Sequence, residues 1–133
     1  MTSAPAARTF GAMRAGPGDY PFDLGAVRTI MGCPAYSTAY HACVEGDRMI
    51  VRLMRKPSDT CAEPHCHPNE QRIHLVEGTF RSTIGGKTIE AAPGAVIYIP
   101  ADAVHSGGAT SDCDFVFFAV KDDSHSLHGI KVS

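Results

Sequence analysis

Residues 65–71 of the chain read HCHPNEQ, and this short segment is the most informative part of the sequence. On an extended backbone, residues two positions apart point to the same side, so His65 and His67 can reach one point in space. The Pro-Asn pair that follows them predicts a turn. Gln71 can then face inward at the start of the next strand. We expect these three side chains to converge.

A second segment, residues 94–105, reads GAVIYIPADAVH and lies about thirty residues further along the chain. It predicts a strand followed by a turn, with His105 at the end. Imidazoles from two separated strands that meet in the mouth of a barrel form a credible metal site, because neutral histidine suits Zn, Fe, Ni and Cu. The expected ligands of one divalent metal ion are His65, His67, Gln71 and His105.

Together the two segments resemble the two motifs of the cupin superfamily. In the first motif, His-x-His is followed by three or four residues, a Glu, six residues and a Gly. The second motif runs Gly, five residues, Pro, four residues and His. The residues of this chain with those spacings are His65, His67, Gln71 and Gly78, and then Gly94, Pro100 and His105. The resemblance implies a small, single-domain cupin.

One position departs from the superfamily pattern in a way that affects the chemistry. Gln71 stands where cupins usually have Glu, so the expected ligands are all neutral and leave the ion its full formal charge. Such an ion is a stronger Lewis acid toward a carbonyl or enolate oxygen. Glu70 is the alternative ligand, but it lies on the opposite side of a strand from Gln71, and strand parity favours Gln71. Some small cupins that open unsaturated uronates resemble this chain in using His, His, Gln and His.

The rest of the sequence predicts short strands separated by turn residues, with no long helical pattern. The predicted strands are Val27–Met31, Ser37–Val44, Arg48–Arg55, Gln71–Val76, Thr79–Ile84, Lys87–Glu90, Ala95–Ile99 and Asp114–Val120. Gly107-Gly108 is expected to be a loop. We therefore expect an all-β fold, the cupin-type jelly-roll β-barrel or double-stranded β-helix. The expected organisation is an N-terminal arm (1–26) that is flexible or packs on a partner subunit, a barrel (27–120) and a polar tail (121–133).

Composition excludes several classes of protein. The chain has 133 residues and a formal net charge of −2, with Lys and Arg scattered, so no basic stripe for nucleic acid is present. Its longest apolar run, Ala91–Ile99, is far too short to cross a bilayer. Five cysteines without regular spacing fit reduced thiols better than a disulfide framework. We expect a cytoplasmic protein that contacts neither membrane nor nucleic acid.

Several other residues could line the cavity, although none has a spacing that assigns it a role. They are His41, Tyr36, Tyr40 and Tyr98, together with Arg52, Arg72 and Arg81 as candidates for binding a carboxylate. His74 is expected on the outer face because it lies three residues past Gln71. Cys66 should point away from the metal. His125 and His128 are expected in a solvated tail or folded over the barrel mouth.

Three functions are compatible with this site. The resemblance gives a narrow lead to an oxygenase of the dioxygenase type that acts on a small molecule with Fe²⁺. The second is a non-oxidative isomerase, lyase or ring-opening enzyme for a sugar acid or carbonyl substrate, for which Mn²⁺, Ni²⁺ or Zn²⁺ would serve. The third is a binding or sensor module without turnover. The resemblance also implies a homodimer.

Overall fold

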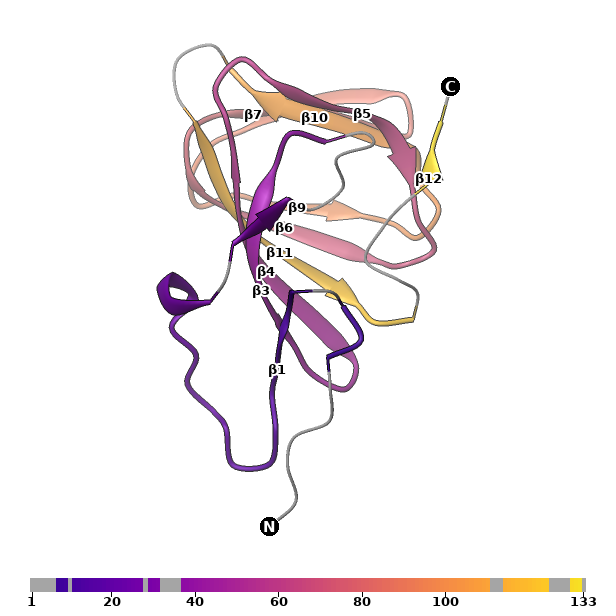
Figure 1. The fold of residues 1–133 in the computed structure, drawn as a ribbon. Coiled ribbons are helices and arrows are strands. Elements are labelled where there is room, and N and C mark those ends of the chain that lie inside the picture. The colour runs from indigo at the N-terminus through magenta and orange to yellow at the C-terminus, as the bar shows by residue number, and fades with distance from the viewer. Residues whose placement is uncertain are drawn as a thin grey trace.

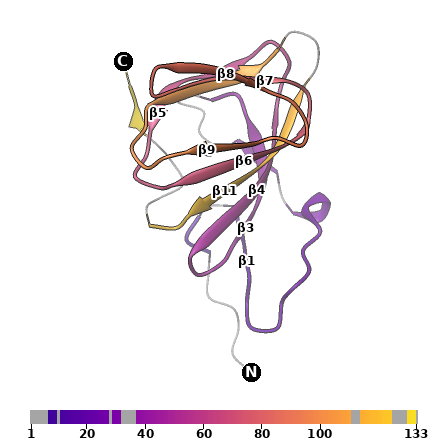
Figure 2. The same ribbon diagram turned by 180° about the vertical axis from the view of Figure 1, so that it is seen from behind.

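The structure is a computed structural model that describes residues 7–9, 11–27, 29–31, 37–110, 114–124 and 130–132. Tyr36, His125 and His128 lie outside these ranges, so the predictions made for them are not addressed. The described part of the chain forms two facing β-sheets joined by turns and loops, with one short 3-10 turn at Leu24–Ala26 (Figures 1 and 2). The all-β jelly-roll fold predicted from the sequence is confirmed.

Each sheet mixes strands from distant parts of the sequence. The larger sheet has the order β1 (Met13–Arg14), β3 (Tyr40–Glu45), β4 (Met49–Lys56), β11 (Phe115–Asp122), β6 (Gln71–Glu77) and β9 (Val96–Ile99), with β2 (Ile30–Met31) paired to β3. The smaller sheet has the order β12 (Ile130–Lys131), β5 (Cys61–Cys66), β10 (His105–Ala109), β7 (Phe80–Ile84) and β8 (Lys87–Ala91).

The core lies between the sheets and follows from strand alternation. In β6, Ile73 and Leu75 are buried while the residues between them are exposed. Three aromatic rings fill the centre: those of Phe80 and Phe117 each stack on Phe115, with ring centroids 4.4 Å apart. Two of these rings, those of Phe80 and Phe117, also line the cavity that contains Gln71.

Four of the described strands were not predicted, namely the short β1 and β12 and the longer β5 and β10, and the last two carry site residues. β5 contains Pro64 and was not recognised as a strand, whereas β10 includes the Gly107-Gly108 pair that was expected to be a loop. The expectation of a loop was wrong because these glycines allow β10 to fit closely between its neighbours. A Cβ on Gly107 would lie 2.4 Å from Cζ of Phe80, and one on Gly108 would lie 2.3 Å from the Thr60 carbonyl oxygen.

The N-terminal region is partly attached to the barrel of the same chain. Within the predicted first strand, Ile30–Met31 form β2. The 3-10 turn before it is capped by Asp23, which accepts a hydrogen bond from Gly25 N at 2.9 Å. β1 pairs in parallel with β3. The fully buried carboxylate of Glu45 accepts hydrogen bonds from the backbone of Arg8 and Thr9 and faces the Arg14 guanidinium at 3.2 Å.

Candidate metal centre

The four predicted ligands come from both sheets and meet between them. His65 is near the end of β5, and His105, the first residue of β10, is its partner in the strand register. His67 follows β5 directly, and Gln71 begins β6 in the other sheet. Their exposed fractions are 8%, 2%, 6% and 7% for His65, His67, His105 and Gln71. The structure thus brings all four side chains into one buried place.

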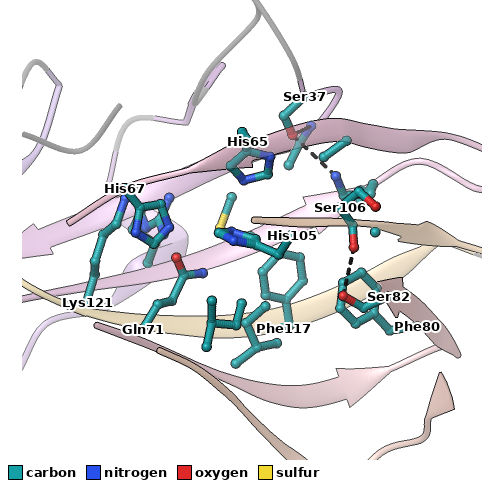
Figure 3. A pocket seen from close by; sticks show the side chains of 18 residues that line it. Ser37, His65, His67, Gln71, Phe80, Ser82, His105, Ser106, Phe117 and Lys121 are labelled. Carbon is teal, nitrogen blue, oxygen red and sulfur yellow. Dashed lines mark hydrogen bonds between the residues drawn. The ribbon is translucent and has the colours of Figure 1, made fainter. Parts of the chain in front are cut away.

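The three imidazole rings surround a common space, and the Gln71 amide is directed toward it (Figure 3). Ring centroids are 4.2 Å apart for His65 and His105, 4.9 Å for His67 and His105, and 6.3 Å for His65 and His67. Rings that share one ion through nitrogen at about 2.1 Å have centroids roughly 4.5–5.5 Å apart. Two of the separations are near this range, and the third is wider.

Each ring is held by a hydrogen bond at its Nδ1 atom. The Nδ1 of His65 lies 2.7 Å from the Glu63 carbonyl oxygen, that of His67 2.9 Å from the Asn69 oxygen, and that of His105 2.9 Å from the Ala103 oxygen. A carbonyl oxygen only accepts, so Nδ1 must carry the proton. In a neutral ring the lone pair is then on Nε2, which is the tautomer that a metal ligand needs.

The surroundings keep these rings neutral. Burial lowers the pKa of His65 to about 3, and the nearby His105, His67 and Lys121 add to the effect, against the hydrogen bond to Glu63. Burial also lowers the pKa of His67 to about 4, helped by the positive charge of Lys121. The pKa of His105 is lowered by burial as well. At neutral pH the cavity therefore offers uncharged nitrogen donors.

The chemistry of this donor set fits a first-row divalent ion, since neutral imidazole nitrogens and an amide oxygen are ligands such ions accept. The distances between the side chains fit an ion less well. Among the described residues, no group of three or more His, Cys, Asp or Glu side chains is arranged so that it could hold an ion as it stands. The wide separation of His65 and His67 is consistent with that. The assignment of these four residues as ligands stays a prediction.

Gln71 and Glu70 lie on opposite sides of the sheet. The Gln71 side chain lines the cavity, whereas the Glu70 carboxylate is at the surface, 3.2 Å from the Arg72 guanidinium. The Tyr98 hydroxyl also donates to Glu70, at 3.3 Å. The placement agrees with the strand-parity argument, so Gln71 is the residue positioned to contribute an oxygen to the site.

The cavity beside the histidines also contains three buried cations that the sequence analysis did not single out as a set. Arg52, Lys56 and Lys121 line it and are 5%, 3% and 2% exposed. Their positions in the alternating pattern of the two strands could have indicated that they face inward. Arg52 and Lys56 share a face of β4 with buried Ile50 and Met54, and Lys121 shares a face of β11 with buried aromatic residues.

Of the two cations on β4, Lys56 is the farther from the end of the strand at which Gln71 and Lys121 are paired. Its Nζ donates to Ser37 Oγ at 3.3 Å. Burial lowers its pKa from 10.5 to about 8, so that a small fraction of the amine is neutral near pH 7. A buried lysine of this kind can carry a positive charge or exchange a proton.

The other candidate residues lie outside the cavity. His41 is buried in β3 but is not among the lining residues, and His74 is exposed on the outer face as expected. Tyr98 is 50% exposed. Arg72 and Arg81 are also exposed, each in an ion pair with a glutamate. Tyr40 and Cys66 are partly buried and do not line the cavity.

Comparison with known proteins identifies the family. A family model described as "Cupin domain" matches residues 52–121, which is more than half of the chain. The protein therefore belongs to the cupin family, as the resemblance implied. No curated protein matches the sequence. Within the described residues there is no helix long and apolar enough to span a membrane.

Solved structures share the fold at low sequence identity. The polyketide cyclase RemF from Streptomyces resistomycificus is 20% identical, with a TM-score of 0.74 over 86% of this chain and 85% of that one. KdgF from Halomonas sp. is 16% identical, with a TM-score of 0.68 over 78% and 93%. A cupin sugar phosphate isomerase from Silicibacter pomeroyi is 16% identical, with a TM-score of 0.69 over 79% and 76%.

Proposed function

We propose that this cupin is a metal-dependent enzyme that acts on a small organic molecule by proton transfer, without net oxidation. The observation that carries the proposal is that one buried cavity contains both the predicted metal ligands and Lys56. The ligands would be His65, His67, Gln71 and His105. A bound divalent ion would supply Lewis-acid polarisation of a carbonyl or hydroxyl oxygen.

Lys56 is the residue placed to move the proton. Its Nζ is within the cavity, is held by Ser37 and is shielded from solvent. General bases work best when their pKa is near the operating pH, and burial has brought the pKa of Lys56 to about 8. Neutral Lys56 would accept a proton from the substrate, and its ammonium form would return one.

Two of the similar structures support non-oxidative chemistry. One is a polyketide cyclase and the other a sugar phosphate isomerase, and neither reaction class requires net oxidation of its substrate. Both resemble this chain at 20% identity or less, so they support the proposal only through the shared fold.

A dioxygenase is the second candidate. Two features favour it: the uncharged imidazole donors suit Fe²⁺, and one side of the cavity is apolar, lined by Ile73, Ile99 and Phe117. The same His65, His67, Gln71 and His105 set would hold the iron. In that case Lys56 would bind the substrate rather than move a proton.

The two functions can be separated on the purified full-length chain. Its metal content is measured by elemental mass spectrometry. The loaded protein is then incubated in D₂O with acetone, dihydroxyacetone and pyruvate, and exchange of the C–H protons is followed by NMR. We expect exchange that needs the ion and is lost in Lys56→Met. Lys87→Met, which removes an exposed lysine from β8, is the matched control and should behave like wild type.

Other results would redirect the assignment. Oxygen uptake by the Fe²⁺-loaded protein with one of these compounds, without proton exchange, would replace the proposal by the dioxygenase. Stoichiometric metal with neither exchange nor uptake would favour a binding module. Exchange that is unchanged in Lys56→Met would remove Lys56 from the mechanism.

A further inference from the structure

The surroundings of Lys56 suit a nucleophilic amine as well as a group that moves a proton. The side chain is 3% exposed and lines the cavity. Its register partner on β11 is Phe115, which is fully buried and stacks on two further phenyl rings. An ammonium ion is costly in such apolar surroundings, whereas a neutral amine is not. A reaction that turns this amine into an uncharged product is therefore favoured here.

The cavity provides no carboxylate that would hold Lys56 in its charged form. Among the described residues that line it there is no Asp or Glu. Lys56 Nζ donates to the Ser37 hydroxyl, which has no charge to offset that of an ammonium ion. Burial accordingly lowers the pKa of Lys56 to about 8, against a smaller opposing effect of the Cys61 thiol.

Ser37 places a hydrogen-bond donor beside the amine (Figure 3). Its Oγ accepts from Lys56 Nζ at 3.3 Å and from the backbone N–H of Ala39 at 3.1 Å. A serine hydroxyl has two acceptor lone pairs and one hydrogen, so two accepted bonds leave its own hydrogen to donate. That hydrogen is available to a carbonyl oxygen whose carbon lies next to Lys56 Nζ.

The size of the cavity restricts the carbonyl compound. Its volume is about 70 Å³. That space holds roughly five or six water-sized groups, which suits a compound of about two or three carbons. Ala39, Met54 and Ala62 form part of the wall, so a short carbon chain has an apolar surface to contact. An aldehyde has only a hydrogen on one side of its carbonyl carbon, so it can approach a packed amine more closely than a ketone can.

We propose that Lys56 captures a small aldehyde in this cavity as a covalent imine. The neutral amine adds to the carbonyl carbon, and one of its hydrogens moves to the carbonyl oxygen, to which the Ser37 hydroxyl donates a hydrogen bond. The resulting carbinolamine loses its hydroxyl, together with the second hydrogen of the amine, as water. A carbon–nitrogen double bond thus replaces the carbon–oxygen double bond without any oxidant or reductant. The inference goes beyond the proposed function, because the imine forms without a metal ion.

Reductive trapping on the full-length chain tests the imine. Chelator-treated protein is incubated at pH 7 with acetaldehyde and sodium cyanoborohydride, which reduces an imine to a stable ethylamine, and peptide mapping locates the ethyl groups. At this pH an amine of pKa about 8 is neutral in about one molecule in ten, against about one in three thousand for an ordinary lysine. Because a less basic amine is also a weaker nucleophile, we expect Lys56 to react about tenfold or more faster than exposed Lys87 of β8.

Three outcomes of this experiment would contradict the inference. They are ethylation of Lys56 no faster than that of Lys87, preferential ethylation of Lys121 at the same cavity, and a preference for Lys56 that persists when the chain is unfolded in guanidinium chloride. The larger benzaldehyde should show no preference for Lys56. A preference as strong as that for acetaldehyde would refute the size argument.

A variant pair tests the reaction without a reductant. Acetaldehyde labelled with ¹³C at its carbonyl carbon, added at one equivalent, should give an imine signal in the NMR spectrum of the wild type and of Lys87→Met. The signal should be absent from Lys56→Met, whose fold is checked by circular dichroism. An imine signal of wild-type strength in folded Lys56→Met would overturn the assignment.

These measurements can fail independently of the proposed function. If the metal-loaded protein exchanges the protons of acetone but Lys56 is not trapped by acetaldehyde, the inference fails and the proposed function stands. If Lys56 is trapped in the metal-free protein but the chain retains no metal and catalyses no exchange, the proposed function fails and the capture of aldehydes stands.

Discussion

Replacement of Lys56 by methionine should stabilise the protein at neutral pH while it removes the proposed proton-transfer group. The side chain is 3% exposed, and burial lowers its pKa from 10.5 to about 8. The unfolded chain therefore holds this proton more tightly than the folded chain does. Below pH 8 the folded state bears the full cost of the buried charge, and above about pH 10.5 that cost is gone.

The size of the effect follows from the pKa values. The difference between 10.5 and about 8 corresponds to about 3 kcal/mol of unfolding free energy at pH 7. Loss of the hydrogen bond from Lys56 Nζ to Ser37 Oγ offsets about 1 kcal/mol of this. Methionine has a similar volume and suits an apolar wall. We expect Lys56→Met to be about 2 kcal/mol more stable than wild type, or roughly 8 °C in Tm.

Urea unfolding at pH 7 and at pH 10.5, followed by circular dichroism, measures this difference. The stability of wild type should rise relative to that of the variant as the pH increases from about 8 to 10.5, because folded Lys56 has lost its proton in this range while Lys56 of the unfolded chain still holds it. Lys87→Met, at an exposed position of β8, should stay within about 0.5 kcal/mol of wild type throughout. A variant that is less stable than wild type at pH 7, or a difference that does not change with pH, would refute the reasoning.

Three further predictions concern the ligands and the barrel. The metal-free protein should lose stability as the pH falls from about 6.5 toward 4, because His65 and His67 bind protons in the unfolded chain but stay neutral in the folded chain. Urea unfolding at pH 5 should show a loss of about 2 kcal/mol per histidine relative to pH 7. Gln71→Ala should weaken metal retention about tenfold or more in competition with a chelator, whereas Glu70→Ala should leave it unchanged; equal retention would contradict the ligand assignment. Gly108→Ala should destabilise the chain by about 3 kcal/mol in urea unfolding, because the new Cβ would meet the Thr60 carbonyl oxygen, and a neutral result would show that β10 can move aside.

The sequence was sufficient to predict the fold class and the family. His65 lies in β5 and His67 lies two residues on, directly after the strand, while the parity of β6 turns Gln71 inward. Local geometry therefore places these side chains on a common side. The family model, which matches residues 52–121, confirms the membership of the cupin family that the motif spacing indicated. β5 and β10 were missed because Pro64 and the Gly107-Gly108 pair are signals of a break, and their tolerance here depends on neighbouring strands.

The cations of the cavity show where sequence reasoning stopped. Arg52 and Lys56 alternate with apolar residues in β4, but a charged side chain on a strand usually faces solvent, so the pattern favours an exposed position. Lys121 follows the same parity as Phe115, Phe117 and Ala119, although it seemed to begin a polar tail. Whether these side chains face water depends on what covers them.

The order of residues along each strand, and therefore which side chains share a face, is determined by the sequence itself because alternation is a local property of an extended backbone. The cover over each face was decided only by the tertiary structure. Residues of both sheets line the cavity, so that Arg52, Lys56 and Lys121 of the larger sheet are buried together with His65 and His105 of the smaller one. That enclosure shields the three charges from water and lowers the pKa of Lys56. Such burial is a property of the assembled sheets and not of any one strand.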